Sequence, residues 1–306
     1  MMGSDSPPEL LWEGVLSARN LLPKEVELVI FAAPELSKVF TSSDISFCPS
    51  PQVIAMDDNP LFAVRRKKES SMMQALQQHA EGVLQAVVSC GNTGALYAGS
   101  CLLLPALPKI DRPALLVNFP TLKSELTLLD VGGNVECKAH HLVEFALLGS
   151  AYSKAVRLIE TPRVALLNIG QEDGKGSAMH REAYEQLTTK NFNFQFIGNI
   201  EARDLFHSSV DVVICDGFSG NVLLKTAEGV SLFFLEQLKS CVPEDKFNAL
   251  ASKFHYLEHP GGFLCGIQGH VIKCHGTAGA QMLTQSILYA SLLAKQNASK
   301  TIANLL

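Results

Sequence analysis

Residues 86–95 read AVVSCGNTGA and join a short apolar run to a glycine-rich turn, after which a helix-compatible stretch begins. The same order recurs in VDVVICDGFSGN at 210–221 and in VIKCHGTAG at 271–279. A β-branched run followed by a turn and a helix is typical of a parallel sheet covered by helices on both faces, so these stretches predict an α/β fold. Further apolar runs alternate with helix-like segments in the same way, at 26–31, 114–119, 127–131, 164–169 and 192–197.

The composition excludes several classes of protein. The chain has 306 residues, of which 47% are hydrophobic and 18% charged, so it can bury a large core without metal or disulfides. Its net charge of −5 shows no basic surplus of the kind that nucleic-acid binding requires. The longest apolar stretches, 101–107 and 114–119, fall far short of the roughly 20 residues that span a bilayer. Because residues 1–8 also lack the pattern of a secretory signal, the sequence predicts a cytoplasmic protein without a nucleic-acid partner.

The sequence indicates neither a metal site nor a division into domains. Its eight cysteines form no CxxC pair. His141 and Glu144, beside His140, have a helical spacing that could hold a metal, but without a third ligand a polar helix face is the favoured interpretation. No repeat, low-complexity segment or long linker interrupts the chain, so we expect a single domain over 1–306.

The turns after the predicted strands favour an anionic ligand. Glycines let backbone N–H groups converge on one point, and a helix N-terminus adds unpaired donors. One such turn is more often mere geometry, but three of them at the carboxyl ends of strands predict a site for a phosphate-bearing ligand. Asn92, Thr93 and Gly94 are the candidate phosphate-binding residues of the first turn.

Nucleotide cofactors are not expected. NIGQEDGKGS at 168–177 resembles a P-loop, but only three residues separate Gly170 from Gly174, and Gly176 stands where a Ser or Thr should follow Lys175. The sequence contains neither GxGxxG nor GxSxG, which removes the dinucleotide fingerprint and the α/β-hydrolase nucleophile. The sequence therefore predicts no cofactor.

Arg65, Arg66 and Lys67 begin the one strong basic cluster of the chain. Such a cluster is either a solvated helix segment or a docking patch for an anionic partner, since arginine matches phosphate bidentately. The sequence leaves both interpretations open.

Seven sequence blocks resemble the bacterial phosphate acyltransferases of phospholipid synthesis, the PlsX family. They follow the family's order and cover nearly the whole chain: 63–72, 89–96, 129–135, 166–176, 197–205, 211–229 and 271–276. The resemblance implies transfer of a long-chain fatty acyl group from acyl carrier protein to inorganic phosphate, which forms an acyl phosphate. It also implies a homodimer and a three-layer α/β/α fold, similar to the phosphotransacetylases and the isocitrate dehydrogenase group.

Two departures from the family pattern lead to further expectations. The family opens with a strand before a Met-Gly-Gly-Asp-His motif, whereas residues 1–6 read MMGSDS, so we expect the first strand to be missing or encoded upstream, and Ser6 replaces the histidine. The segment between Gly229 and Gly261 is shorter than the family's helical excursion, which leaves a short excursion at about 236–262.

The chemistry of this reaction fits the candidate residues. A thioester and an acyl phosphate are both activated acyl donors, so the reaction needs no protein nucleophile. The site must instead orient the substrates, stabilise the oxyanion and exclude water. As catalytic residues we expect Lys175 to neutralise developing charge, Asp216 and Asn221 to orient substrates, and His275 to bind phosphate or protonate the leaving sulfur.

Two further residues are candidates for substrate binding. Lys225 lies one helical turn beyond Asn221 and is expected to assist binding, whereas Asn134 either completes the site or caps a helix. The basic cluster would guide the acidic carrier protein or line the phosphate entrance.

Alternative functions and surfaces remain open from the sequence. The same turns would serve a phosphotransacylase that uses short-chain acyl-CoA, or a non-catalytic module that binds anions or carrier protein. The last helix and residues 232–235 are candidates for the dimer interface. Within 243–259 apolar residues that include Phe254 and Leu257 recur at helical steps, so this face either packs against protein or binds weakly to the membrane surface.

Overall fold

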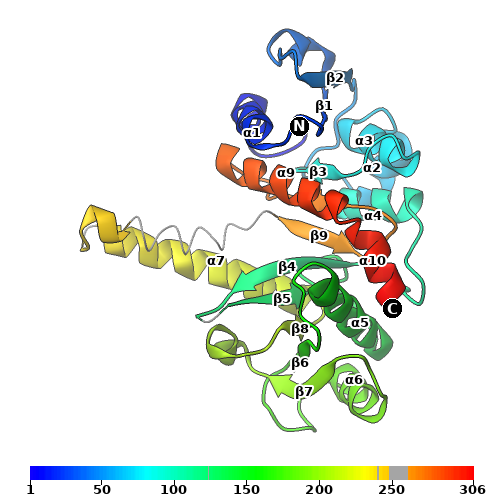
Figure 1. The fold of residues 1–306 in the computed structure, drawn as a ribbon, viewed down its shortest axis with the longest axis vertical. Helices are drawn as coiled ribbons and strands as arrows, with labels where there is room; N and C mark the ends of the chain where they lie inside the picture. Colours follow the sequence, from blue (N-terminus) through cyan, green and yellow to red (C-terminus); the bar gives the residue numbers. More distant parts are fainter. Residues whose placement is uncertain (123, 240, 248–260) are drawn as a thin grey trace. The chain divides into compact units, whose positions relative to one another are not determined.

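The computed structural model describes residues 1–122, 124–239, 241–247 and 261–306 (Figure 1). The chain divides into two compact units, a first unit of Met1–Leu107 with Pro260–Thr301 and a second unit of Pro108–His259 with Ile302–Leu306. The expected α/β class with mostly parallel pairing is confirmed. The single domain over 1–306 stays a prediction.

The first unit is built around two groups of paired strands. Its elements are α1 (Pro8–Leu21), β1 (Leu28–Ala32), the 3-10 helix η1 (Pro34–Lys38), β2 (Ile45–Pro49), α2 (Pro60–Arg66), α3 (Ser71–Ala80), β3 (Val87–Ser89), α4 (Thr93–Leu103), β9 (Gly262–Cys265), β10 (Val271–Lys273) and α9 (Ala280–Lys295), and α10 (Ala298–Leu305) begins in it. β1 pairs with β2 in parallel, and β10 pairs in parallel with β3 and antiparallel with β9.

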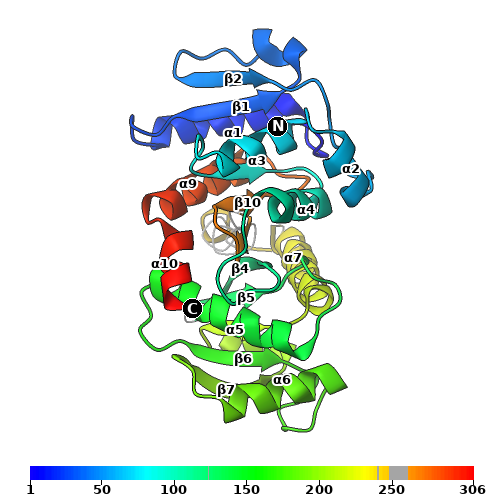
Figure 2. The ribbon, with the colours of Figure 1, turned by 90° about the vertical axis from the view of Figure 1, so that its right-hand side faces the viewer.

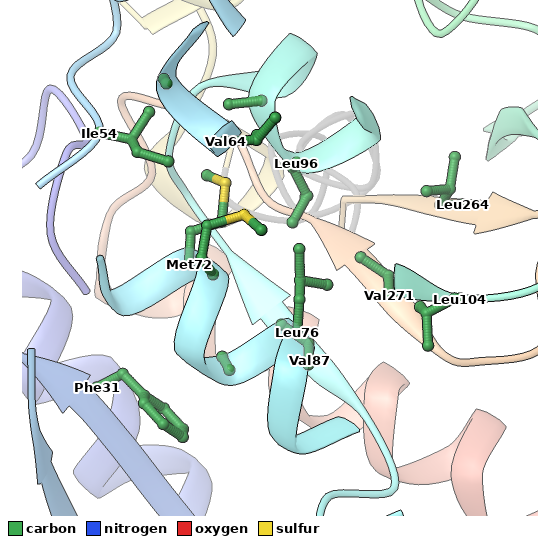
Figure 3. Packing of buried hydrophobic residues seen from close by; sticks show 14 of the residues in the cluster. Phe31, Ile54, Val64, Met72, Leu76, Val87, Leu96, Leu104, Leu264 and Val271 are labelled. Carbon is green, nitrogen blue, oxygen red and sulfur yellow. The ribbon is translucent and has the colours of Figure 1, made fainter. Parts of the chain in front are cut away.

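Buried apolar side chains join the helices of the first unit to its strands. Leu76 of α3, Leu96 of α4 and Val271 of β10 belong to one cluster (Figure 3). At another contact α1 crosses α9 so closely that a Cβ on Gly14 would lie 2.5 Å from the carbonyl oxygen of Ala280. Glycine is therefore required at position 14 by helix packing.

The second unit is built around five paired strands. Its elements are β4 (Ala114–Pro120), β5 (Glu125–Leu129), α5 (Ala139–Ala155), β6 (Arg163–Leu167), α6 (Ala178–Thr189), β7 (Gln195–Ile200), the 3-10 helix η2 (Ala202–His207), β8 (Val212–Ile214) and α7 (Gly217–Lys239). The strand order is β4-β5-β8-β6-β7, in which β5, β8, β6 and β7 are parallel and β4 is antiparallel to β5 (Figure 2).

Two glycines let helices approach this sheet closely. Gly149 of α5 faces Val212, where an added Cβ would lie 2.5 Å from a side-chain methyl group. Gly220 of α7 faces the carbonyl oxygen of Asp130 even more closely. Figure 1 shows α5 and α7 on opposite sides of these strands, so the sheet of this unit is covered on both faces.

Each apolar run predicted to be a strand becomes one, within a few residues at each end. The sequence pattern missed β2 and β9. It also missed the direct connection from β4 to β5. The two strands are antiparallel and are joined by a turn in which Thr121 N–H donates to the Ser124 carbonyl at 2.8 Å. Antiparallel neighbours need no helix between them, so the strand–helix alternation did not indicate this pairing.

The expected helical excursion at about 236–262 lies largely outside the described residues. α7 accounts for it as far as Lys239, and Phe254 and Leu257 belong to the part that is not described. Among the described helices, none combines the length and the apolar character needed to cross a membrane.

Candidate active site

The turn between β3 and α4 in the first unit is organised by Asn92. Its Oδ1 accepts from the N–H of Ala95 at 3.0 Å and so caps α4. Its Nδ2 donates to the carbonyl oxygens of Met56 at 2.9 Å and Asp58 at 3.1 Å, and the residue is only 7% exposed. The Asn92 side chain therefore holds the loop before α2 against the turn.

Thr93 and Gly94 form the first turn of α4, where backbone N–H groups have no partner within the helix. A Cβ on Gly94 would lie 2.7 Å from Cγ of Pro60, so glycine at this position lets α2 approach the start of α4. This turn keeps the features of an anion site, with donors supplied by the main chain rather than by Asn92.

The basic cluster stands on α2 and is joined to this turn. Arg65 and Arg66 are exposed in the last turn of α2, and the Arg66 guanidinium lies 5.7 Å from the ring centroid of Phe62. Lys67 instead forms an ion pair with Asp58 at 2.5 Å, and its hydrogen bond lowers the pKa of that carboxyl group. Asp58 thus connects Lys67 to the loop that Asn92 holds.

The turn after β10 presents His275. The N–H of Thr277 donates to Nδ1 of His275 at 3.3 Å, and the Thr277 hydroxyl lies 2.8 Å from the same nitrogen. A neutral His275 with Nδ1 as acceptor carries its proton on Nε2. The N–H of Asp5 donates to the carbonyl of Gly276 at 3.0 Å, which places Asp5 at this turn. Sequence reasoning missed Asp5, for which the Met-Gly-Gly-Asp-His motif was the available signal.

In the second unit, Asn134 is part of a buried network after β5. Its Nδ2 donates to Oδ2 of Asp130 at 2.9 Å and to the carbonyl of Pro113 at 2.8 Å, and its own carbonyl accepts from Gly217 at 2.8 Å. Burial raises the pKa of Asp130, while hydrogen bonds from its neighbours act in the opposite direction. Asn134 is 4% exposed, and its bond to Gly217 ties the turn after β5 to the start of α7.

Asp216 caps α7. Its two carboxylate oxygens accept from the N–H of Ser219 at 2.9 Å and from the hydroxyl of Ser219 at 2.8 Å. One turn along, the amide of Asn221 lies over Gly132, where an added Cβ would be 2.9 Å from Nδ2. Lys225 is exposed and forms an ion pair with Glu228 at 2.7 Å. Asn221 is therefore held beside the turn after β5, whereas Lys225 belongs to the outer face of α7.

Lys175 lies in the turn between β6 and α6. Its side chain is 47% exposed, lies against Gly170 and ends 3.8 Å from a carboxylate oxygen of Glu172. Asn168 donates to the Lys175 carbonyl at 3.2 Å and to Oδ1 of Asn199 at 3.1 Å. These two asparagines support the Lys175 loop from β6 and β7, and sequence reasoning missed them because their contacts join different strands.

His180 links the Lys175 turn to the Asp216 turn. β6 and β8 are neighbours, and burial lowers the pKa of His180 while the charge of Asp216 raises it. The hydroxyl of Ser177 hydrogen-bonds Nδ1 of His180 at 2.8 Å. The second unit thus brings Lys175, Asp216 and the unpredicted His180 to neighbouring strand ends.

The histidines flagged in the sequence lie beside Asp111. Atoms of Asp111, His140 and His141 lie within 4.8 Å of one another. The N–H of Lys138 donates to Nδ1 of His141 at 2.9 Å, so Nε2 carries the proton and donates to Asp111 at 3.0 Å. Glu144 accepts from the N–H of Asp111 at 2.8 Å. These hydrogen bonds leave His141 no lone pair for a metal and tie α5 to the segment before β4.

The comparisons with known proteins agree across nearly the whole chain. The family model described as "Fatty acid synthesis protein" matches residues 1–301. A protein named Phosphate acyltransferase from an Exiguobacterium species is 39% identical over 95% of this chain and 93% of its own length. The protein of the same name from Clostridioides difficile is 37% identical over 94% of this chain and 88% of its own length.

Solved structures support the fold. A branched-chain phosphotransacylase from Enterococcus faecalis aligns with a TM-score of 0.63 at 13% identity, covering 96% of this chain and 97% of the other. A phosphotransacetylase from Streptococcus pyogenes aligns with a TM-score of 0.62 at 16% identity, covering 94% and 91%. At such identities the likeness concerns the fold alone.

Proposed function

Because this chain belongs to the phosphate acyltransferase family, we propose that it transfers a long-chain fatty acyl group from acyl carrier protein to inorganic phosphate, forming acyl phosphate for phospholipid synthesis. The observation that carries the proposal is the 39% identity to a relative named Phosphate acyltransferase over 95% of this chain. In the reaction a phosphate oxygen attacks the thioester carbonyl, a C–O bond forms, and the C–S bond breaks to release a thiolate. Phosphate is already a nucleophile, so the protein acts by orientation and electrostatics.

Phosphate is assigned to the turn at the start of α4 in the first unit. Its donors are the N–H groups of Thr93 and Gly94, and the partial positive charge of the helix N-terminus adds to them. Asn92 acts by holding this turn, since its own side chain is committed to backbone groups.

Lys175 is assigned the neutralisation of charge that develops during attack. Its ammonium group is half exposed, and its nearest carboxylate oxygen, on Glu172, lies at the loose distance of 3.8 Å. Asp216 and Asn221 position the start of α7 next to the turn after β5, which supports an orienting role for both.

His275 is suited to donate a proton to the leaving sulfur. With Nδ1 accepting from Thr277, the neutral ring has its N–H at Nε2. When the ring has taken a second proton from water, Nδ1–H can donate to the Thr277 hydroxyl, and a proton delivered from Nε2 would convert the leaving thiolate into a thiol and return the ring to its neutral form.

Acyl carrier protein as donor is supported by the exposed pair Arg65 and Arg66. An exposed basic patch attracts an acidic partner and speeds its encounter. The alternative donor is a short-chain acyl-CoA, and the alternative without turnover is a module that only binds anions or carrier protein.

One assay tests the three functions. Purified protein is mixed with palmitoyl carrier protein, palmitoyl-CoA or acetyl-CoA, with and without phosphate, and free thiol is measured. Phosphate-dependent release that is fastest from palmitoyl carrier protein is the expected result. Release from acetyl-CoA alone would favour the short-chain enzyme, and no release from any donor would favour the binding module.

The proposal includes a homodimer formed through α7. Several large apolar side chains on this helix are exposed in the single chain, among them Val230, Leu232, Phe233 and Phe234. An exposed apolar face of this kind is typical of an interaction surface. A second copy of the chain is the occupant that the family resemblance implies.

The proposal also includes weak, reversible association of a cytoplasmic protein with the membrane surface, through Phe254 and Leu257. These residues lie outside the described part of the chain, so support comes from the apolar spacing in the sequence. Wild-type protein should co-sediment with anionic liposomes, and Phe254→Glu with Leu257→Glu should reduce the pelleted fraction. Wild-type protein that stays wholly in the supernatant would contradict this part.

A further inference from the structure

Two cysteines occupy neighbouring positions where β3 and β10 end. The parallel ladder pairs Ser89 with Lys273, and the N–H of Cys274 donates to the Ser89 carbonyl at 2.9 Å. Cys90 and Cys274 directly follow this pair, one residue beyond the ends of the two parallel strands. Neighbouring strands lie about 4.8 Å apart, within the roughly 4.4–6.8 Å between Cα atoms that a disulfide spans.

The surroundings of the pair favour a thiolate on Cys274. The Cys90 thiol and the Ser286 hydroxyl lie close to its sulfur, and the nearby Lys273 adds positive charge. Together these contacts lower the pKa of Cys274, whereas the hydrogen bond to Cys274, together with burial, raises that of Cys90. One sulfur is therefore poised as a nucleophile, and the other remains a thiol beside it.

Both sulfurs are buried, which limits the reagents that can reach them. Cys274 is 0% and Cys90 7% exposed, in a cluster with Ala278 and Leu283. Among the described residues, no third histidine, cysteine or carboxylate joins this pair closely enough to hold a metal. A small neutral oxidant is thus the reagent that fits the site.

We propose that Cys90 and Cys274 are a reversible oxidation site that forms an intramolecular disulfide with hydrogen peroxide. The Cys274 thiolate attacks one peroxide oxygen, an S–O bond forms, and the O–O bond breaks to release hydroxide. The Cys90 sulfur then attacks the sulfenic sulfur of Cys274, an S–S bond forms, and the S–O bond breaks. The proton of Cys90 leaves with that oxygen as water, so two thiols and one peroxide give one disulfide and two waters.

The disulfide would act on the two turns that the cysteines precede. Gly91 and Asn92 follow Cys90, and His275 follows Cys274. A covalent bond at the strand ends would fix the spacing of these turns. The proposal itself concerns the sulfur chemistry and does not depend on the proposed acyl transfer.

The test uses folded protein in which the exposed Cys101 and Cys241 are both replaced by serine, so that intermolecular disulfides cannot form through them. The protein is treated with hydrogen peroxide, alkylated, digested without reductant and analysed by mass spectrometry, with circular dichroism before and after treatment. We expect one linked peptide pair that contains Cys90 and Cys274, with the loss of two hydrogen masses, and its disappearance with dithiothreitol.

Three variants in this background make the test specific. Cys90→Ser should remove the link and leave Cys274 as a sulfenic acid that dimedone traps when the treated protein is unfolded in its presence, because the residue is buried in the folded chain. Cys274→Ser should remove both the link and the trapped adduct. Cys265→Ser is the matched control, because Cys265 is buried in the same unit and has no thiol partner among the described residues. Burial raises its pKa to about 12, and the variant should leave the link intact. The proposal would be overturned if Cys90 and Cys274 remained free thiols in folded protein after treatment. It would also be overturned if the link formed only after unfolding.

Discussion

The backbone N–H of His270 donates to Nε2 of His79 at 3.0 Å, deep in the first unit. His79 Nδ1 lies 2.7 Å from the Leu84 carbonyl, and His270 Nε2 in turn accepts from the N–H of Ser299 at 3.2 Å. Each ring uses one nitrogen as acceptor, which requires the neutral form. Burial accordingly lowers the pKa of both histidines below the ordinary value of 6.5.

From this pair we predict that stability falls on mild acidification. The folded pKa values are lowered, so below about pH 6.5 the unfolded chain binds protons that the folded chain does not. The stabilisation is complete above pH 6.5 and decreases as the pH falls toward the folded pKa values. Melting temperatures from pH 7.5 to 5 should fall more steeply for wild-type protein than for His79→Gln. His207→Gln removes an exposed histidine, so its melting temperature should fall with pH as steeply as that of wild-type protein. An equal fall in melting temperature for all three proteins would contradict the prediction.

Lys175→Ala should keep the fold and lose most turnover. The side chain is half exposed and contributes little to the core, whereas removal of one preorganised electrostatic donor typically costs about 100-fold or more in rate. Thiol release at saturating donor and the melting temperature are measured together. Lys190→Ala, at an exposed lysine of the same unit, is the control and should keep near-normal turnover and melting temperature. Near-normal turnover of Lys175→Ala at an unchanged melting temperature would remove Lys175 from the mechanism.

Asn92→Ala should destabilise the first unit by about 1–3 kcal/mol, because it removes a helix cap and leaves carbonyl groups without their donor. Urea denaturation gives the change in unfolding free energy. The matched control is Asn59→Ala, since Asn59 also caps a helix, through the N–H of Phe62, but is exposed. Asn59→Ala should lower the unfolding free energy by less than Asn92→Ala. An equal decrease would show that the contacts of Asn92 with Met56 and Asp58 do not contribute to stability.

Arg65→Glu together with Arg66→Glu should raise KM for acyl carrier protein by about tenfold at low salt, and this effect should shrink as salt screens the charges. KM for phosphate should stay unchanged if the patch guides the protein donor. A rise in KM for phosphate alone would instead place the patch at the phosphate entrance. Arg203→Glu together with Lys190→Glu, at two exposed basic residues of the second unit, serves as the control for the change in net charge.

Phe233→Glu together with Phe234→Glu should convert a dimer into a monomer. Both rings are more than half exposed in the single chain, so the charges would disrupt an interface rather than the core. Light scattering at assay concentration gives the mass, and Leu158→Glu provides a control at an exposed leucine that is not part of α7. A monomer mass for wild-type protein would contradict the homodimer.

The local pattern of the sequence was enough to predict the strands and their turns. A run such as AVVS at 86–89 and the glycines after it favour a strand and a turn through their own backbone preferences, which depend on near neighbours. The roles of single side chains were less accessible. In the sequence, an asparagine at position 92 gives no sign of whether its side-chain amide binds a ligand or another part of the chain. In the structure this amide donates to a carbonyl 36 positions away.

The sequence by itself determined the α/β class, the order of the glycine-rich turns and the membership in the phosphate acyltransferase family, because these depend on short contiguous stretches. Only the tertiary structure decided which side chains are already occupied and which distant residues are neighbours. Asn134 is bound to Asp130, and His180 stands within the electrostatic reach of Asp216. Cys90 and Cys274 follow the paired Ser89 and Lys273 and lie in one buried cluster. The physical reason is that such partners are set by strand register and helix packing, which bring together positions that the local pattern leaves unrelated.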